Sequence, residues 1–484
     1  MPLPSSASTA TAAAAATVGS EMSSRKRYRG LIWLVSAAFF MQSLDSTIVN
    51  TAVPAIANAL GQTPLNMRSA LTSYVLTLAI LIPASPWLCD RFGTRKVFGV
   101  AISVFAIGSL LCGISQTLSE LVLARVLQGC GGAALMPVGR YVLVRTIDKR
   151  DFVQVMSTVA TFGLLGSVLG PLLGGALVEY TNWRLIFLLN VPVGIVGLWL
   201  NQREMPEYRL ATANRFDLFG FLLFAAASAL LLAASEFAAD QNIRWSWMGS
   251  LVALSLVFGG AYVWHSRRTE HPVADLRLLR IRSVWVALSG NLLTRLGVSG
   301  MFLLIVLFLQ VGCGWSPLMA GLMMVPQALG SISAKWLVNR TLVRLGYRRL
   351  LFGNTLIVAA LIAAFALLGP HTPMLLIALL AFVYGGFMGM QYTVMNTLIY
   401  TDLDVKYASM ASSMASTTQY LSMSFGIALA TILMQTLLHG QGDAAYVEAF
   451  RWTVIVLAVI TAVASRVFAR LEKIPMAATV SSPS

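Results

Sequence analysis

The run LIWLVSAAFFMQSLDSTIVNTA occupies residues 31–52 and contains a single charged side chain, Asp45. A helix that crosses a membrane needs about 20 consecutive, mostly apolar residues, so this run predicts a transmembrane helix. The composition agrees, because 57% of the 484 residues are hydrophobic and only 11% are charged, whereas a soluble protein carries about 25% charged residues. The sequence therefore predicts an all-α integral membrane protein.

Cutting the rest of the chain at glycines, prolines and clusters of charge gives about fourteen transmembrane helices of this kind. Their predicted starts lie near Leu31, Arg68, Val97, Leu121, Val153, Arg184, Asp217, Trp247, Val284, Pro317, Leu350, Met374, Ala408 and Phe450.

An internal similarity divides these helices into groups. The turn after the second span has the sequence DRFGTRK (90–96) and the turn after the tenth has VRLGYRR (343–349), so the glycine and three basic positions are shared. Parallel repeats of this kind place substrate between the two halves, near the middle of the membrane. We therefore expect a disordered cytoplasmic tail at 1–30, a six-helix bundle at 31–203, an inserted helix pair at 217–264, a second six-helix bundle at 284–470 and a cytoplasmic tail at 471–484.

The net charge of +15 is distributed unevenly between alternate loops. Of the 34 Lys and Arg residues, 26 lie in one set of loops and the tails, four in the opposite set and four within apolar segments. Positive charge concentrates at cytoplasmic ends, so we expect both termini in the cytoplasm. No nucleic acid is needed to explain the charge, so we expect no nucleic-acid partner. We expect a multi-pass monomer in the bacterial inner membrane. Its partners would be the lipid bilayer, a small-molecule substrate and protons.

Asp45 is the only carboxylate deep in a core helix of either predicted half. Ionisable groups inside a membrane are costly and mark functional sites. A buried carboxylate can exchange protons, because desolvation favours its neutral form and a neighbouring cation favours its charged form. Arg125 lies near the outer end of the fourth span, which runs opposite to the first, so the two side chains can reach the same depth. We expect a reversible Asp45–Arg125 pair that couples to protons; the alternative is a permanent structural pair.

Two further motifs suggest moving parts. The turn residues Asp90, Arg91, Gly93, Arg95 and Lys96 form a charge-dense hairpin that can latch the cytoplasmic side. Its alternative role is solvated charge that sets the topology. The run GSVLGPLLGG (166–175) contains Gly166, Gly170, Pro171, Gly174 and Gly175. Small residues at this spacing let helices approach closely and proline bends a helix, and from these properties alone plain helix packing is the better explanation of the pattern.

A third set of residues is predicted to bind substrate. Arg125, Arg140 and Arg295 outnumber Asp45 as deep charges, so a cavity among them can receive an anionic group. The alternative is that helix carbonyls and water stabilise these charges. The predicted substrate-binding residues are Gln42, Tyr74, Gln128, Arg140, Asn291, Arg295, Gln391 and Gln419, with further polar or aromatic lining from Gln310, Gln327, Tyr384, Tyr392, Asn396 and Tyr420.

Five stretches in this order resemble the fourteen-span drug:proton antiporter branch of the major facilitator superfamily: the run around Asp45, DRFGTRK, Arg125 to Gly132, GSVLGPLLGG and WRLIFLLNVPVG (183–194). The resemblance implies the major facilitator fold. It assigns Asp45 and Arg125 to proton coupling, Asp90 to gating and residues 166–175 to the hinge. The chain departs from the family pattern at Pro86, where the loop motif usually begins with glycine, and at Val343, where the second copy lacks the acidic residue.

No Walker loop or catalytic motif occurs, so we expect no enzyme, no metal, no cofactor and a proton gradient as the energy source. The sequence favours a proton-coupled antiporter that exports drug-like small molecules by alternating access. Two alternatives stay open. One is an exporter of organic anions such as carboxylate metabolites or metal–citrate chelates, and the other is a non-coupled sensor or channel.

Overall fold

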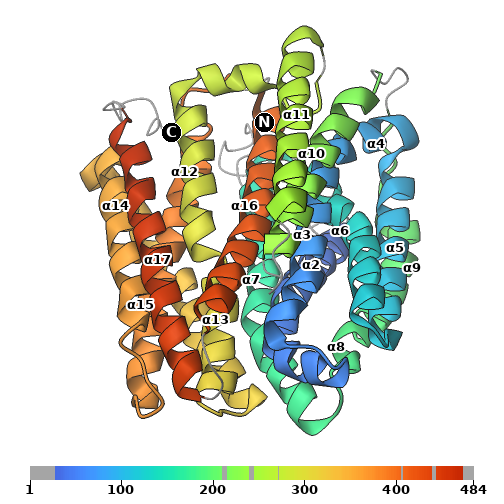
Figure 1. Cartoon of the computed structure of the whole chain (residues 1–484). Coiled ribbons are helices and arrows are strands. Elements are labelled where there is room, and N and C mark those ends of the chain that lie inside the picture. Colours follow the sequence, from blue (N-terminus) through green and yellow to red (C-terminus); the bar gives the residue numbers. More distant parts are fainter. Residues whose placement is uncertain are drawn as a thin grey trace, which may run out of the picture.

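The computed structural model describes residues 28–471 except 210–214, 239–244, 271, 405–406 and 439–442. The predicted tails, a disordered one at 1–30 and a second one at 471–484, lie almost entirely outside the described residues. Within those ranges every regular element is helical (Figure 1). In chain order the helices are α2 (Arg29–Ala59), α3 (Arg68–Leu81), α4 (Ser85–Phe92), α5 (Thr94–Ile114), α6 (Leu118–Thr146), α7 (Lys149–Tyr180), α8 (Arg184–Leu188), α9 (Asn190–Glu204), α10 (Leu218–Ala238), α11 (Trp245–Arg268), α12 (Arg282–Val298), α13 (Met301–Leu307), α14 (Pro317–Phe365), α15 (Met374–Leu398), α16 (Ala408–Leu437) and α17 (Asp443–Ala469).

Thirteen helical segments in the described residues are long and apolar enough to cross a membrane, and α14 supplies two crossings. As one continuous helix its 49 residues would extend about 70 Å, more than twice the membrane core of about 30 Å. Gln327 and Asn354 would then lie about 40 Å apart. However, Gln327 packs against Gly385 and Asn354 forms a hydrogen bond with Gln391, and both of these partners lie in the single helix α15. The chain therefore reverses at Gly346, whose φ of 71° and ψ of 164° are non-helical.

The fourteen predicted spans are confirmed, with one boundary in error. The last span was expected near Phe450, but α17 begins at Asp443, seven residues earlier. Tertiary packing accounts for the extra turns, because Tyr446 and Val447 belong to a buried hydrophobic cluster. Phe450, in the same cluster, stacks on Phe308 with ring centroids 4.3 Å apart.

The two copies of the turn motif have the same backbone conformation. Gly93 has a φ of 91° and ψ of 147°, close to the values at Gly346. Both glycines occupy the left-handed half of conformational space, which other residues rarely enter. The offset between them, 346 − 93 = 253 residues, also maps the span Arg29–Ala59 onto the span Arg282–Gly312, and each has 31 residues. The internal repeat is therefore structural as well as sequential.

Replacing Gly346 by alanine isolates the cost of this backbone conformation, because no neighbouring atom lies within 4 Å of the added Cβ. We expect Gly346→Ala to lower the free energy of unfolding by about 1–2 kcal/mol, since alanine is strained at positive φ. Gly353→Ala is the matched control in the same helix element, also with open space around the Cβ. It should raise the stability by about 0.5–1 kcal/mol. Thermal unfolding of the purified protein in detergent measures both changes, and equal effects would contradict the assignment.

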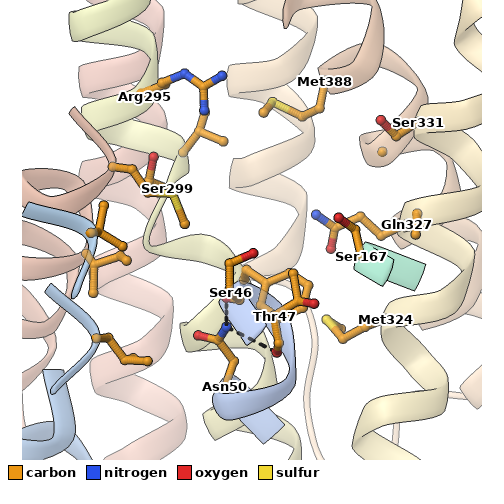
Figure 2. Close-up of a pocket in the computed structure, with 18 of the residues that line it drawn as sticks. Ser46, Thr47, Asn50, Ser167, Arg295, Ser299, Met324, Gln327, Ser331 and Met388 are labelled. Atoms are coloured by element: carbon orange, nitrogen blue, oxygen red, sulfur yellow. Dashed lines mark hydrogen bonds between the residues drawn. The ribbon is translucent and has the colours of Figure 1, made fainter. Parts of the chain in front are cut away.

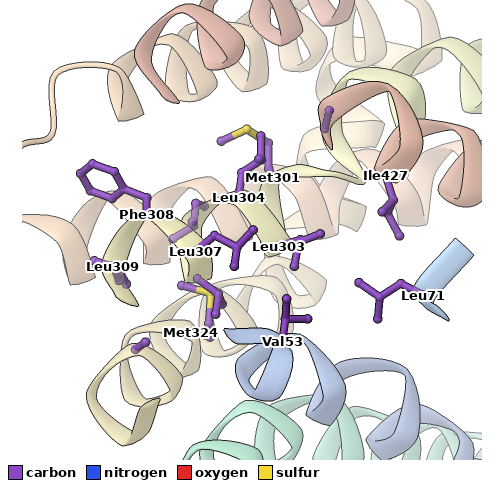
Figure 3. Packing of buried hydrophobic residues seen from close by; sticks show 14 of the residues in the cluster. Val53, Leu71, Met301, Leu303, Leu304, Leu307, Phe308, Leu309, Met324 and Ile427 are labelled. Carbon is purple, nitrogen blue, oxygen red and sulfur yellow. The ribbon is translucent and has the colours of Figure 1, made fainter. Parts of the chain in front are cut away.

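The helices pack as two groups joined along two seams. One hydrophobic cluster has buried members only from residues 31–205 and another only from 278–471. We call helices α2–α9 the N-terminal group and α12–α17 the C-terminal group. A third cluster joins both groups, bringing Val53 and Leu71 beside Met301 and Ile427 (Figure 3). We propose that these two groups are the bundles predicted at 31–203 and 284–470.

The seams are formed by α3 with α16 and by α7 with α14. In the inserted pair, α10 lies against both α3 and α16, while α11 packs on the outside of α10 (Figure 1). The insert therefore covers one seam. The described chain begins and ends on the same side of the bundle, which also carries the turn at Gly93 and is called the Gly93 side below.

Candidate functional site

Asp45 is fully buried in the N-terminal group and its two carboxylate oxygens have different partners. Arg125 Nη1 lies 2.7 Å from Asp45 Oδ2, forming an ion pair. Asp45 Oδ1 accepts hydrogen bonds from Gln128 Nε2 at 2.8 Å and from Asn190 Nδ2 at 3.2 Å. Both amides also donate to the Ser109 hydroxyl oxygen, at 2.9 and 2.8 Å. We call these five residues the Asp45 network.

The network ties together α2, α5, α6 and α9, because each contributes at least one of its members. The pairing of Asp45 with Arg125 follows the expectation from helix direction. Ser109 and Asn190 were missed, although Asn190 lies within the quoted stretch WRLIFLLNVPVG. A polar amide inside a span was the available sign, since such a group needs a buried partner.

Arg125 connects the network to the space between the two helix groups. Its Nη1 also donates to Gln128 Oε1 at 2.6 Å, and its Nε lies 3.4 Å from the Ala70 carbonyl oxygen. The Tyr74 ring covers the guanidinium, with Cζ 4.0 Å from the ring centroid. Cation–π contacts of this kind are strongest when desolvated. Arg125 nevertheless lines a cavity, whereas Asp45 does not.

The cavity has a volume of about 300 Å³ and lies between the N-terminal and C-terminal groups. Figure 2 shows Arg295 at one end and Asn50 near the other. Its polar lining comprises Ser46, Thr47, Asn50, Ser167, Ser299, Gln327 and Ser331, its aromatic lining Tyr74, Phe302, Tyr384 and Tyr392, and its methionines Met324, Met388 and Met423. Aromatic rings and flexible thioethers adapt to differently shaped ligands.

Arg295 is the second cation in this lining and, with 7% of its surface exposed, it is largely buried. Its Nε donates to Asn291 Oδ1 at 2.6 Å, and Tyr392 lies under the guanidinium, 3.8 Å from Cζ to the ring centroid. Among the described residues, no carboxylate lies within ion-pair distance of Arg295, in contrast to Arg125.

The remaining predicted substrate residues lie outside the cavity lining. The Gln128 amide is committed to the Asp45 network. Gln391 accepts from Asn354 at 2.7 Å and donates to Thr355 at 2.8 Å within the C-terminal group. Gln42 is buried, and its Oε1 has no hydrogen-bond partner in the part of the chain that the structure describes. Arg140 is exposed, and its Cζ lies 5.6 Å from the centroid of the Phe39 ring. Gln419 is half-buried. Tyr74, Arg295 and the lining residues Gln327, Tyr384 and Tyr392 are the predicted residues that reach the cavity.

The charges of the Asp45 network occur in one half only. The offset of 253 residues relates Asp45 to Val298, Arg125 to Ala378 and Gln128 to Ala381. The same offset relates Arg295 to Gln42. Any chemistry that needs the carboxylate therefore belongs to the N-terminal group, while the unpaired guanidinium belongs to the C-terminal group.

The predicted gating turn is held within the N-terminal group. Asp90 Oδ1 accepts a hydrogen bond from the Tyr141 hydroxyl at 2.7 Å, and Arg95 Nε donates to the Met205 carbonyl oxygen at 2.8 Å. Arg91 and Lys96 are exposed. The hydrogen bonds described for this turn thus connect it to α6, to α9 and to the segment after α9, not to the C-terminal group.

The predicted hinge glycines face two different neighbours. A Cβ on Gly166 would lie 2.5 Å from the Phe40 carbonyl oxygen, and Cβ atoms on Gly170 and Gly174 would collide with Thr47 and Thr51 of the same helix, α2. Gly175 instead faces Pro317 and Leu318 of α14, across the seam. The run therefore packs α7 within its own group and also against the other group.

Hydrogen bonds between described residues join the two groups in the half of the membrane region away from the Gly93 side. Arg68 donates to Gln435 at 2.8 Å and Ser424 donates to the Thr72 carbonyl oxygen at 3.1 Å. Gln310 donates to the Thr51 carbonyl oxygen at 2.9 Å, and the Leu318 amide donates to Glu179 at 3.0 Å. The groups are therefore closed against each other at this end.

Sequence comparison relates the whole bundle to known proteins. A family model described as Major Facilitator Superfamily matches residues 35–427. The chain is 41% identical over 448 residues to the "Putative multidrug resistance protein MdtD" of Klebsiella pneumoniae subsp. pneumoniae, which covers 92% of this chain and 94% of the relative. It is 42% identical over 455 residues to the protein of the same name from Cronobacter sakazakii, with the same two coverages.

Solved structures of low sequence identity share the fold. A bacterial homologue of the human lysosomal transporter Spinster, in an inward-facing and unoccupied conformation, matches with a TM-score of 0.63 at 15% identity, covering 91% of this chain and 96% of that one. An auto-inhibited peptide transporter of the POT family matches with a TM-score of 0.66 at 14% identity, covering 92% and 98%.

Proposed function

The chain belongs to the Major Facilitator Superfamily and is a multi-pass membrane transporter, not an enzyme, and from that premise we propose that it is a proton-coupled antiporter that exports small molecules. The observation that carries the proposal is the position of Arg125, which pairs with the buried Asp45 at 2.7 Å and also lines the cavity between the helix groups. Protonation of Asp45 would break the ion pair and release Arg125, and the guanidinium that lines the cavity would then be free to change its position.

The transport cycle we propose alternates between two arrangements of the helix groups. The hydrogen bonds that close the end away from Gly93 support a state whose cavity faces the Gly93 side. The concentration of basic residues on that side supports its cytoplasmic location, in the inner membrane of a bacterium. A protein in this state would take cargo from the cytoplasm. Proton entry from outside would then drive the return.

Drug-like compounds are the leading cargo class, since the relatives carry "multidrug resistance" in their names and the cavity is rich in methionine and aromatic side chains. The test is purified protein in liposomes under an imposed pH gradient, with internal pH followed while tetraphenylphosphonium or a metal–citrate chelate is added. Solute-evoked, saturable proton flux is the expected result. Solute movement without proton flux would indicate a channel or uncoupled carrier and overturn the proposal.

A second cargo class, organic anions, is favoured by Arg295 alone. Its buried guanidinium lies at one end of the cavity with no carboxylate in ion-pair distance among the described residues. An acidic group of the cargo would complete a charge-assisted hydrogen bond there.

We expect Arg295→Gln to raise the KM for the metal–citrate chelate about 100-fold, because a buried ion pair lost from one partner costs about 3 kcal/mol or more. The KM for tetraphenylphosphonium should change little. Arg140→Gln is the control, since Arg140 is exposed and outside the cavity lining. Initial rates of solute-evoked proton flux in liposomes measure both constants. Equal effects of Arg295→Gln on the two solutes would remove the grounds for an anionic cargo.

A further inference from the structure

Tyr74 stands between the cavity and the Asp45 network. Its ring covers the Arg125 guanidinium at 4.0 Å, and both Tyr74 and Arg125 line the cavity. Asp45 and its other network partners do not line the cavity. Tyr74 is itself fully buried. A solute or water molecule in the cavity therefore meets the tyrosine before it meets the carboxylate.

Glycines of α6 make room for this side chain. A Cβ on Gly132 would lie 3.3 Å from the Tyr74 hydroxyl oxygen, and a Cβ on Gly129 would lie 3.0 Å from the Tyr74 carbonyl oxygen. Both distances are tighter than normal packing allows for most side chains. The glycines of the fourth span therefore let α3 approach α6 and seat the ring on Arg125.

Among the described residues, the buried Tyr74 hydroxyl has no hydrogen-bond partner. Buried hydroxyls in proteins are nearly always paired, so an orphaned one beside a cavity points to a ligand. Tyr74 is one of the residues that line the cavity. An acceptor atom on a molecule in the cavity is thus the natural partner for this hydroxyl.

We propose, on the basis of the proposed antiport, that Tyr74 is the positioning residue that makes proton exchange at Asp45 depend on cargo. Its ring is a lid that packs on Arg125 and shields Asp45 from water in the cavity. Its hydroxyl binds a hydrogen-bond acceptor of the cargo, and that contact moves the lid. Because coupling between two binding sites is reciprocal, protonation of Asp45 then changes the affinity for cargo through the same ring.

The lid predicts the chemical accessibility of Asp45. Dicyclohexylcarbodiimide attaches to protonated, buried carboxyls, and mass spectrometry of the purified transporter gives the labelling rate at Asp45. Tyr74→Leu removes the ring from Arg125, so we expect labelling about tenfold faster than in the wild type. Tyr384→Leu is the matched control. Tyr384 is also fully buried and lines the same cavity, but its ring partner is Phe365 and not Arg125.

Equal labelling rates at Asp45 in Tyr74→Leu and Tyr384→Leu would overturn the lid. This measurement needs no cargo, so it tests the lid independently of antiport. If the protein is not an antiporter, solute-evoked proton flux will instead be absent in the wild type. Tyr74→Phe provides a second test that keeps the ring, including the case where Tyr74→Leu does not fold. Its basal labelling should equal that of the wild type. The change in labelling caused by the metal–citrate chelate, whose carboxylates can accept a hydrogen bond, should disappear, and its persistence would overturn the role of the hydroxyl.

Discussion

Asp45→Asn is expected to abolish solute-evoked proton flux, because the residue that binds the proton is lost, and to destabilise the fold by about 3–5 kcal/mol, because one partner of a buried ion pair is removed. Asparagine matches the shape of aspartate and can still accept a hydrogen bond from Arg125 or Gln128. It cannot bind or release a proton. The variant therefore removes the proton site at nearly constant side-chain shape, with its NH2 group facing one set of the donors that the carboxylate accepts from. Proton flux in liposomes and thermal stability in detergent measure the two consequences.

Stability and coupling can be separated by a double variant. Asp45→Asn alone leaves Arg125 buried without its counter-charge, so we expect the melting temperature to fall. Adding Arg125→Gln removes the lone charge and should restore much of the stability, but not the proton flux. Restored flux in the double variant would show that the pair is structural.

Asp217→Asn is the control for losing a buried carboxylate elsewhere. Asp217 Oδ1 lies 2.7 Å from His265 Nε2 and its side chain is 5% exposed. This pair lies at the ends of the inserted helices, outside the cavity lining. Solute-evoked proton flux should persist in Asp217→Asn. Its loss to the same extent as in Asp45→Asn would argue that both variants act through general destabilisation.

The fold was predictable because the membrane imposes a length and a polarity on every span. Gly93 and Gly346 marked the repeat in the sequence, and their shared positive φ explains why no other residue serves there. The depth of Asp45 and Arg125 followed from counting residues along antiparallel helices. The start of α17 did not follow, because Tyr446 is buried by tertiary contacts that no local pattern contains.

The cavity lining was predictable only in part, since it depends on the rotation of each helix about its axis. Lipid and the packed interior of a membrane protein are both apolar, so hydrophobic periodicity does not show which face points inward. Gln128 and Gln327 look alike in sequence. Gln128 is held in the Asp45 network, whereas Gln327 lines the cavity and its Oε1 has no hydrogen-bond partner within the described ranges.

The direction in which each face points is equally unpredictable for the glycine run of α7, where adjacent residues contact different helices. Gly174 faces Ile48 and Thr51 of α2, within one helix group. Gly175 faces backbone atoms of Pro317 and Leu318 in the other group. The reciprocal contact is made by Gly321, which faces the Pro171 carbonyl oxygen. The crossing of α7 and α14 therefore depends on glycine from both sides, so a side chain there should separate the groups.

Gly175→Leu is expected to shift the transporter away from the conformation closed at this end. Its Cβ would lie 2.8 Å from the Leu318 Cα, and backbone atoms cannot move aside as a flexible side chain does. Overpacking of this kind costs about 1–3 kcal/mol, which changes a two-state population ratio by about 5- to 150-fold. Spin labels at the exposed residues Gln62 and His371, in a background without the native cysteines, report the separation of the two groups at this end.

We expect a longer Gln62–His371 distance in Gly175→Leu and a comparable fall in solute-evoked proton flux, because a transporter held in one state cannot complete its cycle. Gly353→Leu is the matched control, since Gly353 has no atom within 4 Å of its Cβ position and lies in the same element as Pro317. Its distance distribution should equal that of the wild type. If Gly175→Leu loses flux but keeps the wild-type Gln62–His371 distance distribution, Gly175 serves helix packing in the folded state. The α7–α14 seam would then not control the exchange between conformations.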